Sequence, residues 1–169
     1  PPTEDYHTPN AVSFDPIRAK QLLQEAGYGG SKKLRVTLLS TDREVSKRLS
    51  EAYQDMWKKH LDAEVSIEQR EWKTYLSRMS ELDYQLALGG WIGDYPDPTT
   101  FLDMWKTGDG NNRTGWSNKQ YEALLATAEQ TKDPDTRLRI LEQAAGHDII
   151  PFSGGLSRGV FLEVVRKEL

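Results

Sequence analysis

The sequence has no cysteine, no long apolar run and no excess of basic side chains, and each absence excludes a class of protein. Without cysteine there are no disulfides, thiolate nucleophiles or cysteine-based metal sites. No stretch approaches the roughly 18 to 20 consecutive apolar residues of a membrane-spanning helix. Because 22 Lys and Arg stand against 26 Asp and Glu, no basic surplus is present to neutralise a phosphate backbone, and we expect no nucleic-acid partner.

The start of the chain also lacks a charged segment followed by an apolar stretch, which is the form of an export signal. Pro1 stands where an initiator Met would be, so we expect a mature or excised segment, and the missing signal does not argue against export. The composition is that of a globular protein, with 37% hydrophobic residues and five Trp, seven Tyr and four Phe among 169 residues. This length and composition suit one domain with its own hydrophobic core.

The clearest structural pattern is a strand, a helix and a second strand in succession. β-Branched and alternating residues predict strands over 34–39 and 63–68. Between them, apolar residues at three- and four-residue spacing predict a helix that begins after Thr41 and runs to about residue 60, with Thr41 and Glu44 as a capping box. Two strands joined by a helix of this length form a βαβ unit, whose strands run parallel. We therefore predict an α/β fold with a mixed, mostly parallel sheet flanked by helices.

Further elements follow from helix starts and from periodicity. The additional predicted elements are a helix from Asp15-Pro16 to Gly27, a helix over 71–79, a strand over 84–88, a short helix over 99–105, and two helices that start at Ser117 or Asn118 and at Asp133-Pro134. The last two are expected to form an antiparallel pair. We divide the chain into a proline-rich lead-in at 1–13, an α/β lobe at 14–152 and an atypical C-terminal segment at 153–169 that could form an edge strand.

No pattern indicates catalysis, a cofactor or a metal. His7, His60 and His147 lie in unrelated contexts without the spacing of paired metal ligands. Nucleophile-elbow, phosphate-binding and dinucleotide motifs are absent. The stretch 108–112, Gly-Asp-Gly-Asn-Asn, lacks the alternating ligands and terminal Glu of a calcium loop and is expected to be a plain turn.

The densest chemical feature is the segment 90–102, where a predicted strand runs into a loop with two carboxylates, a Trp and a Tyr. In open α/β sheets, ligands bind at such strand ends. We predict that Asp94 pairs with a ligand cation such as an ammonium, while Trp91 and Tyr95 provide apolar or cation-π contact. The alternative is a rigid turn in which Asp97 caps the next helix. Spacing alone does not separate the two interpretations, but Asp97 is the better cap and Asp94 the better ligand partner.

Several blocks together resemble the C-terminal lobe of the oligopeptide- and dipeptide-binding proteins that serve ABC importers, within the extracellular solute-binding proteins of family 5. The blocks are 14–16, 19–23, 25–28, 91–102, 116–118 and the residues Tyr121, Leu124, Leu125 and Ala128. They keep the family's order and approximate spacing over residues 1 to about 151. The resemblance implies a lobe of a type II periplasmic binding protein, with the ligand held between two lobes joined by a hinge.

The same resemblance implies roles and partners. Asp94 occupies the place of the aspartate that pairs with the ligand's α-amino group, and Trp91 matches the aromatic residue of the side-chain pocket. The implied partners are a peptide or other small solute, the membrane subunits of an ABC importer and the N-terminal lobe of the parent chain. The implied location is periplasmic or extracellular and membrane-anchored. The tail from Phe152 to Leu169 departs from the family pattern, which leaves open whether the cleft is complete.

Three other functions stay open at this point. A family relative could carry a nickel chelate, haem or a sugar, and a ligand without a free amine would leave Asp94 without a partner. A glycosidase could use Asp94 and Asp97 as an acid and base, which requires both carboxyls to face one cleft about 5 to 10 Å apart. A purely structural domain would leave the loop of Trp91 packed and closed to solvent.

Overall fold

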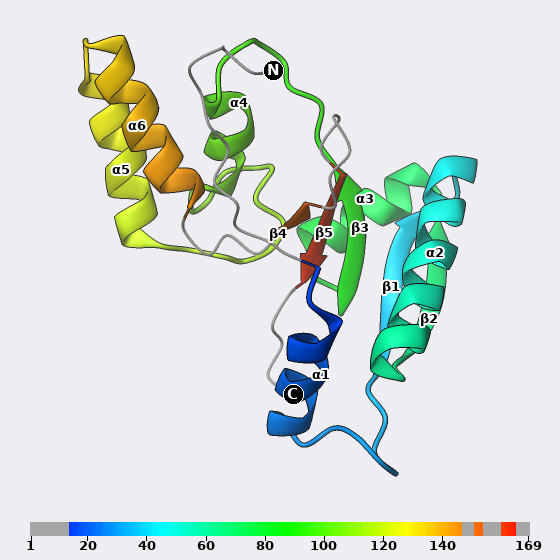
Figure 1. Ribbon diagram of the computed structural model, residues 1–169. Coiled ribbons are helices and arrows are strands. Elements are labelled where there is room, and N and C mark those ends of the chain that lie inside the picture. Colours follow the sequence, from blue (N-terminus) through cyan, green and yellow to red (C-terminus); the bar gives the residue numbers. More distant parts are fainter. Residues whose placement is uncertain (1–13, 147–150, 154–159, 165–169) are drawn as a thin grey trace.

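The strand-helix-strand unit that the sequence predicts is the start of a mixed sheet. The computed structural model describes residues 14–146, 151–153 and 160–164 (Figure 1). In chain order the elements are α1 (Pro16–Glu25), β1 (Arg35–Thr41), α2 (Glu44–Leu61), β2 (Glu64–Arg70), α3 (Trp72–Ser80), β3 (Leu86–Gly90), α4 (Thr99–Leu102), the 3-10 turn η1 (Asp103–Trp105), α5 (Lys119–Gln130), α6 (Pro134–Ala145), β4 (Pro151–Ser153) and β5 (Val160–Val164). The lead-in at 1–13, whose extended form is predicted, lies outside the described residues.

The sheet has the strand order β2-β1-β3-β5-β4. β1 runs parallel to both β2 and β3, while β5 is antiparallel to β3 and to β4. Four strands therefore point one way and β5 points the other, which confirms the predicted mixed, mostly parallel sheet. The expectation of an edge strand within 153–169 is wrong for β5, because this strand pairs on both sides; the edge position belongs to β4.

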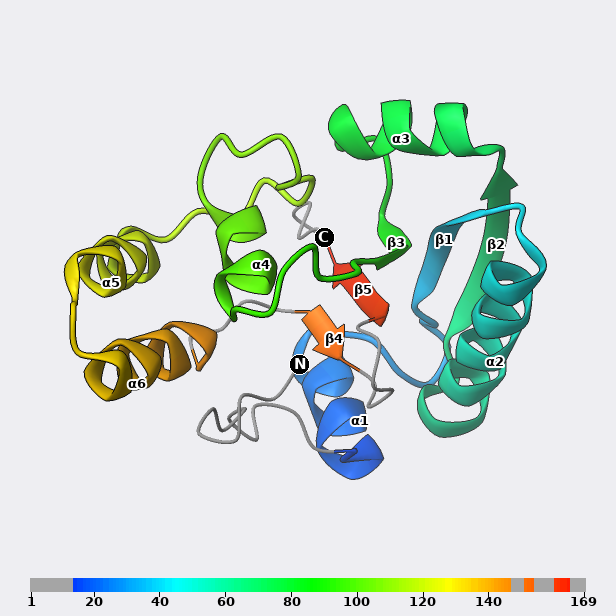
Figure 2. The same ribbon diagram turned by 90° about the horizontal axis from the view of Figure 1, so that it is seen from above.

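The two faces of the sheet are covered by different helices, and two consecutive leucines of β1 pack on opposite faces. Leu38 packs with the apolar side chains of α2, and Leu39 packs with those of α3. Both leucines are 1% exposed, and burying each contributes about 1.5 to 3 kcal/mol. Figure 2 shows α2 and α3 on opposite sides of β1 and β2. Alternation of side chains along a strand is what allows one strand to anchor two layers.

A second core lies among the helices that follow β3. Tyr121 and Leu141, both 0% exposed, stand at the centre of a cluster formed by α4, η1, α5 and α6. The Tyr121 hydroxyl donates a hydrogen bond of 2.5 Å to the Leu102 carbonyl, which ties α5 to α4. The predicted pair α5 and α6 is confirmed, at the end of the molecule opposite α2 (Figure 1).

Most of the predicted helix starts are confirmed by cap hydrogen bonds. Asp15, Asn118 and Asp133 each accept bonds from backbone N–H groups in the first turn of α1, α5 and α6. The capping box of Thr41 and Glu44 is wrong. Thr41 is the last residue of β1, and α2 begins at Glu44 after an N-cap without a side-chain bond. The strand is longer than predicted, so Thr41 does not reach the cap position.

Candidate functional site

The loop 91–98 leaves the carboxyl end of β3 and leads into α4. β3 has a strand on each side, with parallel β1 as one neighbour, so the loop emerges from the interior of the sheet and not from its edge. This is the position at which open α/β sheets hold ligands. The structure therefore places Trp91, Asp94 and Tyr95 on one loop at the carboxyl end of the parallel strands, as the sequence predicts.

Asp94 is exposed and its carboxylate is free within the described part of the chain. Its backbone N–H donates to the Thr100 hydroxyl at 2.9 Å, which fixes the backbone at this point. The carboxylate itself has no hydrogen bond or ion pair with any described residue. The Asp94 carboxylate thus faces solvent from a fixed backbone position, and no Arg or Lys in the described part of the chain pairs with it.

Asp97 has the opposite surroundings and serves the turn. Its carboxylate accepts from the Thr99 N–H at 3.0 Å and from the Thr99 hydroxyl at 2.7 Å. It also accepts two hydrogen bonds from the Arg137 guanidinium, at 2.8 and 3.0 Å. The Arg137 guanidinium and the Thr99 donors outweigh partial burial and lower the pKa of Asp97 from 3.8 to about 2. This carboxylate is ionised and compensated within the protein, and it holds the turn before α4 through Thr99; the N-cap position predicted for Asp97 is occupied by Pro98.

The two aromatic side chains of the loop differ in exposure. Trp91 is half-buried and packs against the second core, and its indole N–H is buried without a hydrogen-bond partner among the described residues. Tyr95 is 45% exposed, and its hydroxyl shares a hydrogen bond of 3.3 Å with the Thr99 hydroxyl. Trp91 therefore packs its ring partly against the second core, while Tyr95, the neighbour of Asp94 in the sequence, exposes its ring to solvent.

Three residues that sequence reasoning did not select hold this loop in shape. A Cβ atom at Gly93 would lie 3.0 Å from the Phe101 ring, so a larger residue would require the ring to move for the loop to approach α4 this closely. Thr100 accepts the Asp94 N–H, and Arg137 binds Asp97 from α6, 40 residues along the chain. The Gly-Asp pair is a local signal that could have identified Gly93, but no local pattern links Arg137 to the loop.

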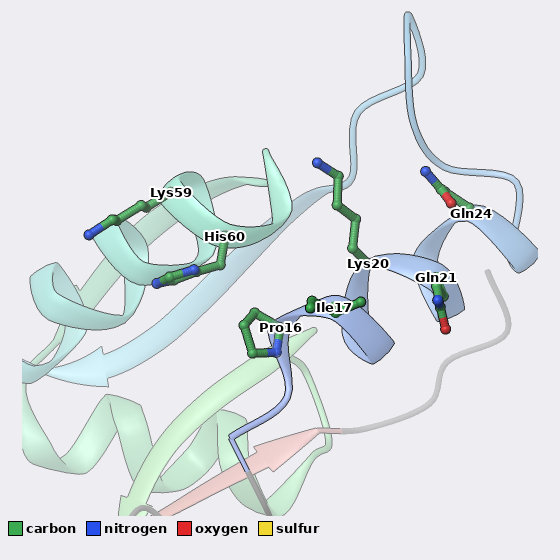
Figure 3. Close-up of a pocket in the computed structure, with 7 residues that line it drawn as sticks. All are labelled: Pro16, Ile17, Lys20, Gln21, Gln24, Lys59 and His60. Carbon is green, nitrogen blue, oxygen red and sulfur yellow. The ribbon is translucent and has the colours of Figure 1, made fainter.

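The structure also has a shallow hollow of about 340 Å³ between α1 and the end of α2, away from the loop (Figure 3). It is lined by Pro16, Ile17, Lys20, Gln21, Gln24, Lys59 and His60. The ring of His60 packs edge-to-face against Phe14, with 5.4 Å between ring centroids. No cluster of three or more metal-binding side chains occurs in the described ranges. The residues that line this hollow include no carboxylate, whereas the loop 91–98 carries two.

Comparison with known proteins points to one family. Residues 1–113 match the model of the bacterial extracellular solute-binding proteins, family 5 Middle. The oligopeptide-binding protein OppA of Bacillus subtilis is 31% identical over 85% of this chain and 27% of its own length. The periplasmic murein peptide-binding protein MppA of Escherichia coli is 36% identical over 66% of this chain and 21% of its own length.

The solved structures agree with the sequence relatives. OppA of Haemophilus influenzae, determined in complex with the peptide RPPGFSPFR, superposes with a TM-score of 0.74 at 30% identity, over 77% of this chain and 26% of that one. The chain therefore spans about a quarter of the length of the relatives that it matches. No described helix combines the length and the apolar character that crossing a membrane requires.

Proposed function

We propose, from the fact that this chain belongs to the bacterial extracellular solute-binding proteins, family 5, that it forms one ligand-binding lobe of a peptide-binding protein of an ABC importer. The relatives named as oligopeptide- and murein peptide-binding proteins, and the peptide bound to the Haemophilus influenzae protein, support a peptide as the ligand. The proposed partners are a second lobe on the far side of the ligand and the membrane subunits of the importer. The proposed location is outside the cytoplasmic membrane, with the parent protein anchored to it.

The observation that carries this proposal is the exposed carboxylate of Asp94, free among the described residues, on the same loop as Trp91 and Tyr95. An ammonium group can approach Asp94 from solvent and form a charge-assisted hydrogen bond, which is stronger than a neutral one. Trp91 and Tyr95 then contact the adjacent atoms of the ligand or the cation itself. Closure of the second lobe would remove water from this contact and strengthen it. The proposed mechanism is capture and release without bond chemistry.

The glycosidase alternative is disfavoured by the state of Asp97. An acid and base pair requires one carboxyl that holds a proton near neutral pH. The pKa of Asp97 is lowered to about 2 by Arg137 and Thr99, so this group is ionised and cannot donate a proton at neutral pH. A structural role in the turn fits Asp97, and a role in binding fits Asp94, better than an acid and base pair fits the two.

The proposal is tested on the two-lobed parent protein by native mass spectrometry as purified, followed by calorimetric titration with a peptide library. We expect co-purifying peptides, and binding that requires a free amino terminus. A parent protein that carries no peptide and binds none in titration would overturn the proposal. The isolated chain of 169 residues should bind weakly or undetectably, because half of the contacts are missing; micromolar affinity of this chain alone would contradict the shared-cleft mechanism.

A further inference from the structure

The loop 91–98 carries two carboxylates three residues apart, and among the described residues only Asp97 has a partner. The side chains of Asp97 and Arg137 are 32% and 28% exposed, so their ion pair lies at the protein surface and not in the core. Asp103 also acts electrostatically on Arg137, but its carboxylate is paired with Lys106 at 2.7 Å. Arg137 is therefore the cation that compensates Asp97, and its removal would leave a second anion near Asp94.

Arg137 also lies at one end of a hydrogen-bonded chain that reaches Tyr95. The guanidinium binds Asp97, Asp97 accepts from the Thr99 hydroxyl at 2.7 Å, and that hydroxyl meets the Tyr95 hydroxyl at 3.3 Å. The bidentate geometry fixes the carboxylate plane as well as its position. A side chain on α6 thus sets both the charge of the loop and the orientation of one proposed wall of the site.

We propose that Arg137 is a specificity-determining residue. By holding Asp97 in a bidentate pair, it leaves Asp94 as the single free anion of the loop. The site therefore selects ligands with one ammonium group over ligands with two nearby cations. This inference rests on the proposed function, since it assigns charge selectivity to the same loop. It goes further in naming a residue outside the loop, on α6, as the source of that selectivity.

The test compares peptides that differ in a single charge. The parent protein is titrated with tripeptides that carry Lys or norleucine at the first or second position, because norleucine keeps the length of the side chain and removes the ammonium. In Arg137→Gln the freed Asp97 should raise the affinity ratio of Lys peptides to norleucine peptides by about three- to fivefold, the scale of an exposed ion pair. The matched control is Arg139→Gln, which removes the same charge from an exposed position of α6.

Two further variants separate charge from structure. Arg137→Gln combined with Asp97→Asn should restore the wild-type ratio, because the freed anion is removed. Asp97→Asn alone leaves Arg137 unpaired and should shift the ratio in the opposite direction, so the inference stays testable if Arg137→Gln does not fold.

The possible outcomes separate the inference from the proposed function. An equal loss of affinity for all peptides in Arg137→Gln, or an equal shift of the ratio in Arg139→Gln, overturns the inference and leaves peptide binding intact. A ratio in Asp97→Asn that stays at the wild-type value also overturns it. Failure of the wild-type parent protein to bind any peptide overturns the proposed function, and the inference with it.

Discussion

Replacement of Asp97 by Asn should remove a defined part of the protein's stability at neutral pH. The pKa of Asp97 falls from 3.8 to about 2 on folding, and one pKa unit corresponds to about 1.4 kcal/mol. Since the side chain is 32% exposed, solvent screening reduces the expected contribution to about 1 to 2 kcal/mol. A lowered pKa in the folded state stabilises the fold above the unfolded pKa, and this stabilisation is lost as the pH falls toward about 2.

The assay is urea unfolding of the chain, followed by tryptophan fluorescence, at about pH 6 and about pH 2.5. Because the folded pKa of about 2 lies below pH 2.5, about two thirds of this contribution is lost between these values, so the wild type should lose roughly 0.7 to 1.3 kcal/mol more unfolding free energy than Asp97→Asn. Asp94→Asn is the matched control: its carboxylate has no partner among the described residues, so its loss should match that of the wild type to within about 0.5 kcal/mol. Equal losses in wild type and Asp97→Asn would refute the stabilising role of the pair with Arg137.

Three substitutions test the packing of the fold. Gly93→Ala places a Cβ atom 3.0 Å from the Phe101 ring and should lower the unfolding free energy by about 1 to 3 kcal/mol, whereas Gly110→Ala meets no atom within 4 Å; equal melting temperatures for the two variants would contradict the tight approach. Leu141→Ala leaves a cavity at a side chain that is 0% exposed and should cost about 2 to 5 kcal/mol in urea unfolding, so a cost below about 1 kcal/mol would argue against a second core. Ser50→Ala removes a buried hydroxyl without a partner among the described residues and should leave stability unchanged or raise it by up to about 1 kcal/mol; a clear loss would show a hydrogen bond at this position.

The regular elements were predictable because their signals are local. Asp15 before Pro16 and Asp133 before Pro134 combine a side-chain acceptor with a fixed φ, and both start helices in the structure. Strand ends were less predictable, because they depend on partners far along the chain. β3 was expected over 84–88 and is found at Leu86–Gly90. Tyr84 packs instead in the core beneath α3, and its hydroxyl donates to the carbonyl of Arg113.

In the candidate site, too, the local features were predictable and the contact between distant residues was not. The loop of Trp91, Asp94 and Tyr95 was predicted from a local cluster of aromatic and acidic residues, and its role in ligand binding stays a prediction. The contact that distinguishes the two carboxylates was not predictable, because Arg137 lies 40 residues from Asp97 and meets it only through the packing of α6 beside α4. Spacing could rank Asp97 as the better cap, but only the fold shows that its charge is compensated.

The α1 helix shows a further limit of pattern reasoning. Its apolar residues fall on one face, a pattern that is typical of a helix packed against a core. In the structure no residue of α1 is buried, and Ile17 and Leu22 are 73% and 49% exposed. Periodicity identifies the helix and the face that is suited to packing, but it does not say whether another element covers that face.

The central claim is that Asp94 receives the amino terminus of a peptide. The most direct measurement is calorimetric titration of the two-lobed parent protein, wild type and Asp94→Asn, with one peptide in its free and its N-acetylated form. We predict that Asp94→Asn weakens binding of the free peptide by about 1.5 to 3 kcal/mol, roughly 10- to 150-fold, and leaves the acetylated peptide almost unaffected. Equal affinity of wild type and variant for the free peptide would contradict the account.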